Sequence, residues 1–174
     1  MIKVFKTDEI YEILKKRIIN LKYEPGQILN EEDVAAEFSV SRTPVRKIFQ
    51  QLSADKLINI IPRYGAQATP IDFKHMKSVF EVTRQLDPFA TRLAVERINK
   101  EQIEALEEIM NRLNSYDIKN DYQQAIQDDE LFHQTILYSS GNPCLAELLT
   151  SLHLHTERLW HYSEQYIDNM DIFT

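Results

Sequence analysis

The stretch Ser41-Arg42-Thr43-Pro44-Val45-Arg46 has the composition of a helix start. Ser41 is a favourable N-cap residue, and Pro44 is tolerated because it lies in the first turn. Arg42 and Arg46 are four residues apart, so they share one face of that helix. The opposite, apolar face carries Val45, Ile48, Phe49 and Leu52. The stretch therefore begins an amphipathic helix with two cations at its first turn.

Two interpretations fit this cationic helix start. Arginine can donate two hydrogen bonds to the O6 and N7 atoms of guanine, which is the commonest specific contact in the major groove. Ser41 and Thr43 can donate to phosphates, and Lys47 would add a phosphate contact that is independent of base sequence. By spacing alone, a solvated polar face on an ordinary helix explains the same residues equally well.

The elements around the stretch follow a definite order. Apolar spacing predicts a helix over 7–21, and Asn30 is a suitable N-cap for a second, short helix before the third one at Ser41. The period then changes to that of a strand over 57–61, a turn, and a second strand over 66–69. Three helices followed by a hairpin are the order of a winged helix-turn-helix.

Everything after Thr69-Pro70 has the pattern of helices. We therefore predict a mainly α protein with a winged helix-turn-helix domain over 1–70 and an all-helical bundle over 71–174. Pro88 either kinks the first bundle helix or starts a second one. N-caps are expected at Asp72 and Asn99, a long helix over about 121–140, and a further helix that opens at Asn142-Pro143. The core stripe of the helix after Asn99 is expected at Ile103, Leu106, Ile109, Met110 and Leu113.

Charge is divided unevenly between these regions. Residues 1–70 carry eleven Lys and Arg against nine Asp and Glu, whereas 71–174 carry nine against eighteen, within a net charge of −7. A mildly basic head on an acidic body suits a nucleic-acid-binding domain joined to a separate sensing domain. No apolar window reaches membrane-span length, no secretory signal is visible, and the single Cys144 cannot form an internal disulfide. We expect a cytoplasmic protein.

Several ordered motifs resemble the GntR family of bacterial regulators. They are Pro25-Gly26-Gln27-Ile28-Leu29, the run from Val40 to Arg46 with Leu52, and Pro62-Arg63-Tyr64-Gly65-Ala66. The resemblance implies DNA contacts at Ser41, Arg42, Thr43 and Arg46, and a wing tip at Arg63 and Gly65. Two positions depart from the family pattern, because Glu32 and Tyr64 stand where basic residues are frequent. Both departures suggest fewer phosphate contacts or a shifted sequence preference.

The second half resembles the effector-binding FCD domain of the FadR subfamily. The similarity lies in 80–87 (FEVTRQLD), 129–133 (DELFH) and 140–145 (SGNPCL). It implies that Asp129 and His133 are ligands of one divalent metal, Zn²⁺ or Ni²⁺. It also implies that Arg84 is the cationic partner of a small carboxylate effector. The alternative for Arg84 is an internal ion pair with Glu81 or Asp87.

The family's metal site uses two further histidines from a later helix, and the sequence ends at Thr174 before any such segment. We therefore expect an incomplete FCD-like domain and an incomplete metal site. His153, His155 and His161 are substitute ligands, and His75 is a more remote one. The remaining conspicuous residues are more typical of packing: the aromatic group Trp160, Tyr162 and Tyr166, and Cys144 as a small buried thiol.

Together these patterns predict a homodimeric transcription regulator, not an enzyme. It would bind a double-stranded DNA operator, acting most often as a repressor, and respond to a small carboxylate. Two other classes stay open on the sequence. One is a metal-dependent hydrolase built on the helical bundle, and the other is a helical interaction module with weak DNA binding.

Overall fold

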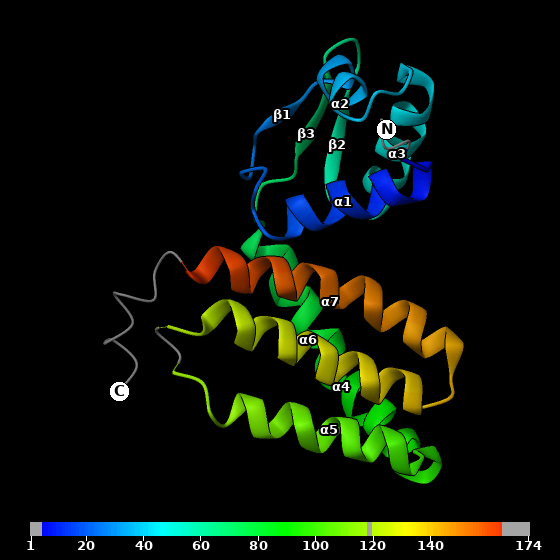
Figure 1. Cartoon of the computed structure of the whole chain (residues 1–174), viewed down its shortest axis with the longest axis vertical. Helices are drawn as coiled ribbons and strands as arrows, with labels where there is room; N and C mark the ends of the chain where they lie inside the picture. Colours follow the sequence, from blue (N-terminus) through cyan, green and yellow to red (C-terminus); the bar gives the residue numbers. More distant parts are fainter. Residues whose placement is uncertain (1–4, 118–119, 165–174) are drawn as a thin grey trace. The chain divides into compact units, whose positions relative to one another are not determined.

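The computed structural model describes residues 5–117 and 120–164 of the 174-residue chain. The chain divides into two compact units, residues 1–71 and 72–174. In the described ranges, unit 1 contains three helices and a small sheet, and unit 2 contains four helices (Figure 1). We describe each unit by itself.

Unit 1 is built around a three-stranded antiparallel sheet with the strand order β1-β3-β2. Helix α3 packs against α1, α2 and β2 (Figure 1). The elements are α1 (Thr7–Ile19), β1 (Ile28–Leu29), α2 (Glu31–Glu37), α3 (Arg42–Ala54), β2 (Ile58–Ile61) and β3 (Gly65–Ala68).

The core of unit 1 follows the predicted apolar faces. The four inward residues of α3 are at most 2% exposed: Val45, Ile48, Phe49 and Leu52. Three residues of α1 are completely buried: Ile10, Leu14 and Ile18. Burying a side chain of this size contributes about 1.5–3 kcal/mol. Helix α1 ends earlier than predicted, since Leu21 has the left-handed φ of 53°.

The sheet differs from the predicted hairpin in one strand. Strand β1 was not predicted, because its two residues are too few for a two-residue period to be recognised. Its Leu29 is paired with Ala66 of β3. At the adjacent Gly65 the φ is +115°, and a Cβ would overlap the carbonyl oxygen of Leu29. Glycine is therefore required at position 65 by the approach of β1.

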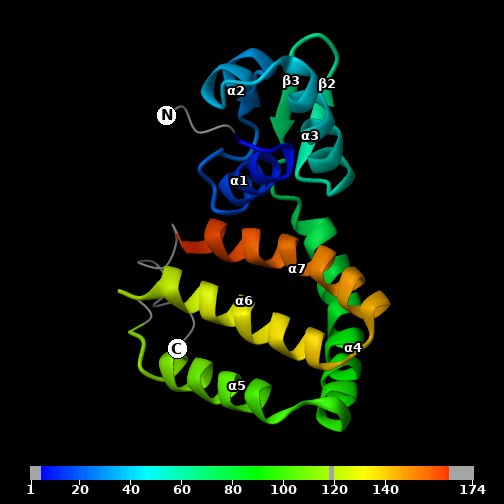
Figure 2. The same cartoon turned by 45° about the vertical axis from the view of Figure 1, so that its right-hand side comes forward.

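Unit 2 is a bundle of four helices: α4 (Phe73–Arg97), α5 (Lys100–Leu113), α6 (Tyr122–Ser139) and α7 (Pro143–Glu164). Figure 2 shows α5, α6 and α7 side by side, with α4 running across them. Helix α6 packs against the other three. One core cluster contains Ala90, Leu137, Leu145 and Leu149, all at most 6% exposed.

Three predicted helix starts of unit 2 have side-chain capping bonds, and at one of them Asn142 Oδ1 accepts from the backbone N–H of Leu145 at 3.2 Å. The Asp72 side chain accepts hydrogen bonds from the backbone N–H groups of Lys74 and His75. Asn99 forms a capping box with Gln102. Pro88 lies inside α4, which continues unbroken to Arg97, so of the two alternatives for this proline the start of a second helix is wrong. Packing against α6 and α7 holds the helix through the proline.

Two expectations about burial in unit 2 are also wrong. Only Ile109 of the predicted α5 stripe is buried, whereas Ile103 is 42% exposed and Met110 is 41% exposed. Helix α5 lies at the edge of the bundle, with α6 as its main neighbour, so one narrow strip is covered. Cys144, expected to be buried, is exposed in the first turn of α7.

A polar cluster fastens α5 to α6. The Arg112 guanidinium donates from Nε and Nη2 to the two carboxylate oxygens of Asp128, at 2.8 and 2.6 Å. The Tyr116 hydroxyl donates to the same carboxylate at 2.7 Å. The Arg112 hydrogen bonds outweigh the effect of burial and hold the pKa of Asp128 below its ordinary value.

None of the described helices is long and apolar enough to cross a membrane.

The close approach at Gly65 leads to a stability prediction. We expect Gly65→Ala to destabilise unit 1 by about 1–3 kcal/mol, because the methyl group strains the backbone and collides with Leu29. Gly26→Ala is the matched control: its φ is +90°, but nothing lies within 4 Å of an added Cβ. Urea unfolding of the three proteins measures both effects. If the two variants lose the same free energy of unfolding, then the positive φ, and not the contact with β1, is the reason that position 65 requires glycine.

Candidate functional site

The N-terminal turn of α3 presents the predicted cations to solvent. The side chains of Arg42 and Arg46 are 49% and 61% exposed. Both arginines donate to one oxygen, Oε2 of Glu31: Arg42 from Nη2 at 2.9 Å and Arg46 from Nε at 2.9 Å. Arg42 also donates from Nη1 to Glu32 at 2.8 Å. The two arginines thus share a face, as their spacing predicts, and an acidic partner that the sequence did not reveal.

The other predicted DNA contacts in unit 1 are at the surface. Ser41 is the N-cap of α3 and makes no side-chain capping bond, so its exposed hydroxyl is not engaged in a cap. Thr43 and Lys47 are exposed on the same helix. At the turn between β2 and β3, Arg63 is exposed and has the left-handed φ of 71°, and Tyr64 is 74% exposed. The turn therefore projects a cation and an aromatic ring into solvent.

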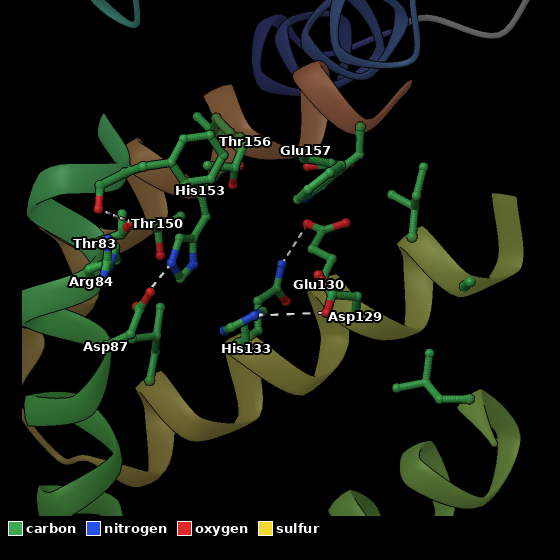
Figure 3. Close-up of a pocket in the computed structure, with 18 of the residues that line it drawn as sticks. Thr83, Arg84, Asp87, Asp129, Glu130, His133, Thr150, His153, Thr156 and Glu157 are labelled. Atoms are coloured by element: carbon green, nitrogen blue, oxygen red, sulfur yellow. Dashed lines mark hydrogen bonds and ion pairs between the residues drawn. The ribbon is translucent and has the colours of Figure 1, made fainter. Parts of the chain in front are cut away.

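Unit 2 contains a cavity of about 610 Å³ between α4, α6 and α7 (Figure 3). This volume is in the range of sites that hold small molecules. Its apolar wall includes Phe80, Ile126, Leu137, Leu154 and Trp160. Its polar and charged lining residues are Thr83, Arg84, Asp87, Asp129, Glu130, His133, Gln134, Thr150, His153, Thr156 and Glu157.

Two histidines face one another in this cavity, each beside a carboxylate (Figure 3). His153 Nε2 lies 3.1 Å from Oδ1 of Asp87, and His133 Nε2 lies 3.8 Å from Oδ1 of Asp129. The two imidazole centroids are 5.0 Å apart. One ligand atom from each of Asp87, His133 and His153 lies within 4.8 Å of the others. These three residues come from α4, α6 and α7.

This set differs from the one expected from sequence. Asp129 and His133 are adjacent, but the compact group contains Asp87 in place of Asp129. His153, one of the predicted substitutes, is in the group. His75 and His155 pack ring against ring at 5.5 Å, and His161 is buried with Nδ1 unpartnered in the described part of the chain. None of these three is among the residues that line the cavity.

Arg84 lines the cavity without the internal ion pair considered as its alternative. Among the described residues, the nearby carboxylates have other partners: Asp87 bonds to His153, and Glu81 pairs with Lys77 at 3.8 Å. The proline four residues after Arg84 also removes the helical N–H donor to the Arg84 carbonyl. Among the described residues that line the cavity, Arg84 thus lies with four carboxylates and two imidazoles.

Of the three aromatic residues singled out in the sequence, Trp160 and Tyr162 do not form one group in the structure. Trp160 lines the cavity and packs near Phe80, with ring centroids 6.5 Å apart. Tyr162 packs against Phe73 at 6.2 Å, away from the lining. Tyr166 lies outside the described residues.

Each of the two units matches the model of a known protein family. Residues 6–67 match the model of bacterial regulatory proteins of the gntR family, and residues 78–173 match the model of the FCD domain. The chain belongs to the GntR family and carries an FCD domain. The resemblance and the mainly α fold class predicted from the sequence are confirmed.

Two relatives with curated descriptions are transcriptional repressors. The gluconate operon transcriptional repressor of Bacillus subtilis (strain 168) is 34% identical over 128 residues, which are 71% of this chain and 51% of that protein. The galactonate operon transcriptional repressor of Escherichia coli (strain K12) is 28% identical, covering 82% of this chain and 70% of that one. The chain is therefore a DNA-binding transcription regulator, and the prediction that it is not an enzyme is confirmed.

A solved structure agrees with the fold. Escherichia coli McbR/YncC superposes with a TM-score of 0.81 at 23% identity, covering 99% of this chain and 80% of that one. At this identity the likeness supports the GntR and FCD folds alone. Family membership also removes the metal-dependent hydrolase as an interpretation of the cavity.

Proposed function

We propose that this GntR-family protein is a homodimeric repressor whose operator binding is controlled by a small carboxylate held in unit 2. Residues 1–70 would read a short, pseudo-palindromic operator in double-stranded DNA, and 71–174 would bind the effector and assemble the dimer. It would act in the cytoplasm, where a bacterial operator is found. The observation that carries the effector part is Arg84, an unpaired cation among the described residues that line the 610 Å³ cavity.

The proposed DNA surface consists of the start of α3 and the β2–β3 turn. Arg42 and Arg46 supply base contacts, because both project from the exposed face of a helix whose other face is buried. Hydroxyl and ammonium groups around them are suited to phosphates. The proposed contact residues are Ser41, Arg42, Thr43, Arg46, Lys47, Arg63 and Gly65.

The DNA-reading role is tested by substitution on α3. We expect Arg42→Ala and Arg46→Ala each to cost about 1–3 kcal/mol of specific binding. The probe is a duplex selected by the native chain from a randomised pool, and the measurement is a titration at fixed salt. Lys47→Ala is the matched control, because loss of a phosphate contact should weaken binding to selected and shuffled duplexes alike. Undiminished affinity in both arginine variants would refute the base-reading role.

The effector would bind with its carboxylate against Arg84. An arginine can hold a carboxylate through two parallel hydrogen bonds, which fixes orientation as well as charge. Thr83 and Thr150 in the same lining offer hydroxyl groups for further polar contacts, and Trp160 offers an apolar surface. This mixture suits a small, hydroxylated acid. Gluconate and galactonate are reasonable first probes, since the operons of two relatives are named for these sugar acids.

A thermal-shift assay with these two acids tests the effector site. We expect an acid that binds to raise the Tm of the native chain and to lose this effect in Arg84→Ala. Arg92→Ala is the matched control, since Arg92 lies on the same helix, stacks on Phe89 and does not line the cavity. Equal ligand-induced shifts in native and Arg84→Ala proteins would refute the role of Arg84.

We further propose that one divalent metal, Zn²⁺ or Ni²⁺, binds in the cavity through Asp87, His133 and His153. Two imidazoles and a carboxylate are a donor set that both ions accept, and the three ligand atoms lie within 4.8 Å of one another. Asp129, the carboxylate expected from sequence, lies beside this group, with its Oδ1 3.8 Å from His133 Nε2. When bound, the ion would supply a positive charge that attracts the effector carboxylate beside Arg84.

Metal titration separates the two carboxylates. We expect Asp87→Asn and His153→Ala to weaken Zn²⁺ or Ni²⁺ binding by more than about 100-fold, beyond the loss typical of an outer-sphere residue. Asp129→Asn is the matched control and should weaken it by about 100-fold or less, as expected for a residue beside a ligand. Isothermal titration with each metal chloride measures the constants. The reverse order of losses would make Asp129 the ligand and Asp87 a neighbour.

A further inference from the structure

The acidic residues at the start of α2 are placed against the arginines at the start of α3. Glu31 follows the N-cap Asn30, whose side chain accepts from the Glu32 N–H at 2.7 Å, so the backbone at this point is fixed. The Glu31 side chain is only 18% exposed, although both arginines that it contacts are far more exposed. The carboxylate is thus enclosed between two guanidinium groups.

The contacts differ for the two arginines. Arg42 donates to carboxylates from three nitrogens: Nε and Nη2 to Glu31, at 3.2 and 2.9 Å, and Nη1 to Glu32 at 2.8 Å. Arg46 donates only from Nε, to Glu31 at 2.9 Å. The Nη groups of Arg46 make no hydrogen bond in the described part of the chain, so they are available for the edge of a base.

The Glu31 carboxylate stays ionised at ordinary pH. Its partial burial would raise the pKa, but the hydrogen bonds and charges of Arg42 and Arg46 outweigh that effect and lower it. A fixed negative charge therefore stands beside the two residues that are proposed to face DNA. Such a charge repels a phosphate, which carries a full negative charge, more strongly than it repels the neutral edge of guanine with its O6 and N7 acceptors.

We propose that Glu31 is a specificity-determining residue: it orients Arg42 and Arg46 toward base edges and opposes their use as simple phosphate contacts. This inference rests on the proposed DNA-reading role of the two arginines. Non-cognate DNA, which offers mainly phosphates to these side chains, would be bound less tightly because the carboxylate opposes that use. A cognate base pair would accept the arginines in the orientation that Glu31 already imposes, so less ordering is needed on binding.

The test compares Glu31→Gln with the native 174-residue chain on two probes: the duplex selected from a randomised pool and a shuffled duplex of the same composition. We expect Glu31→Gln to bind the shuffled duplex more tightly and to reduce the ratio of the two affinities by about twofold to thirtyfold, as set by two exposed ion pairs. The logarithmic dependence of shuffled-duplex affinity on salt should steepen by about one to two, because freed arginines contact phosphates.

Two further variants complete the experiment. Glu32→Gln is the matched control: Glu32 is 70% exposed and, within the described ranges, pairs with Arg42 alone, so its effect on the ratio should be smaller. Glu31→Asp keeps the charge, but its shorter side chain cannot reach both arginines, so this variant should also lose discrimination. It provides the test if Glu31→Gln folds poorly. An unchanged ratio and salt slope in Glu31→Gln and Glu31→Asp would overturn the inference. Absence of duplex binding by the native chain would instead refute the proposed function.

Discussion

The burial of one face of α3 is the constraint on which unit 1 depends. Four apolar side chains of this helix are removed from water against α1, α2 and β2. The helix cannot rotate about its axis without exposing them, so positions 42 and 46 are held outward. The orientation of the two arginines is thus a result of core packing, and the acidic start of α2 then limits how their guanidinium groups can point.

The local elements of both units could be predicted from sequence because their signals are local. The apolar face of α3 and the caps at Asn30 and Asp72 depend on residues within one or two helical turns. Strand β1 could not be recognised, since two residues carry no period, and it forms because β3 offers it an edge. Helical spacing also overstated the burial of α5, because spacing does not tell how many neighbours will cover a helix.

In the candidate sites, too, the local features could be predicted from sequence, whereas the contacts between distant residues could not. The positions of Arg42, Arg46, Asp129 and His133 follow from spacing and from family motifs. The partners of these residues do not. Glu31 lies eleven residues from Arg42, and Asp87 lies 66 residues from His153, so each contact depends on how helices pack. Glu32, a departure from the family pattern, therefore belongs to a defined cluster with Arg42. Asp87, which lies in a family motif, faces the imidazole of His153 on another helix.

The unbroken course of α4 has a mechanical consequence. This helix starts at Phe73, immediately after the boundary of the two units in the sequence, and lines the cavity with Arg84 and Asp87 before it reaches Pro88. With a rise of 1.5 Å per residue, Arg84 lies about 16 Å along the axis from the start of the helix. A rod of that length is stiff, so a tilt or twist applied beside Arg84 is delivered at residue 73 without any relay of side chains. The residues that line the cavity on α4 and the first residue of that helix therefore belong to one continuous hydrogen-bonded element.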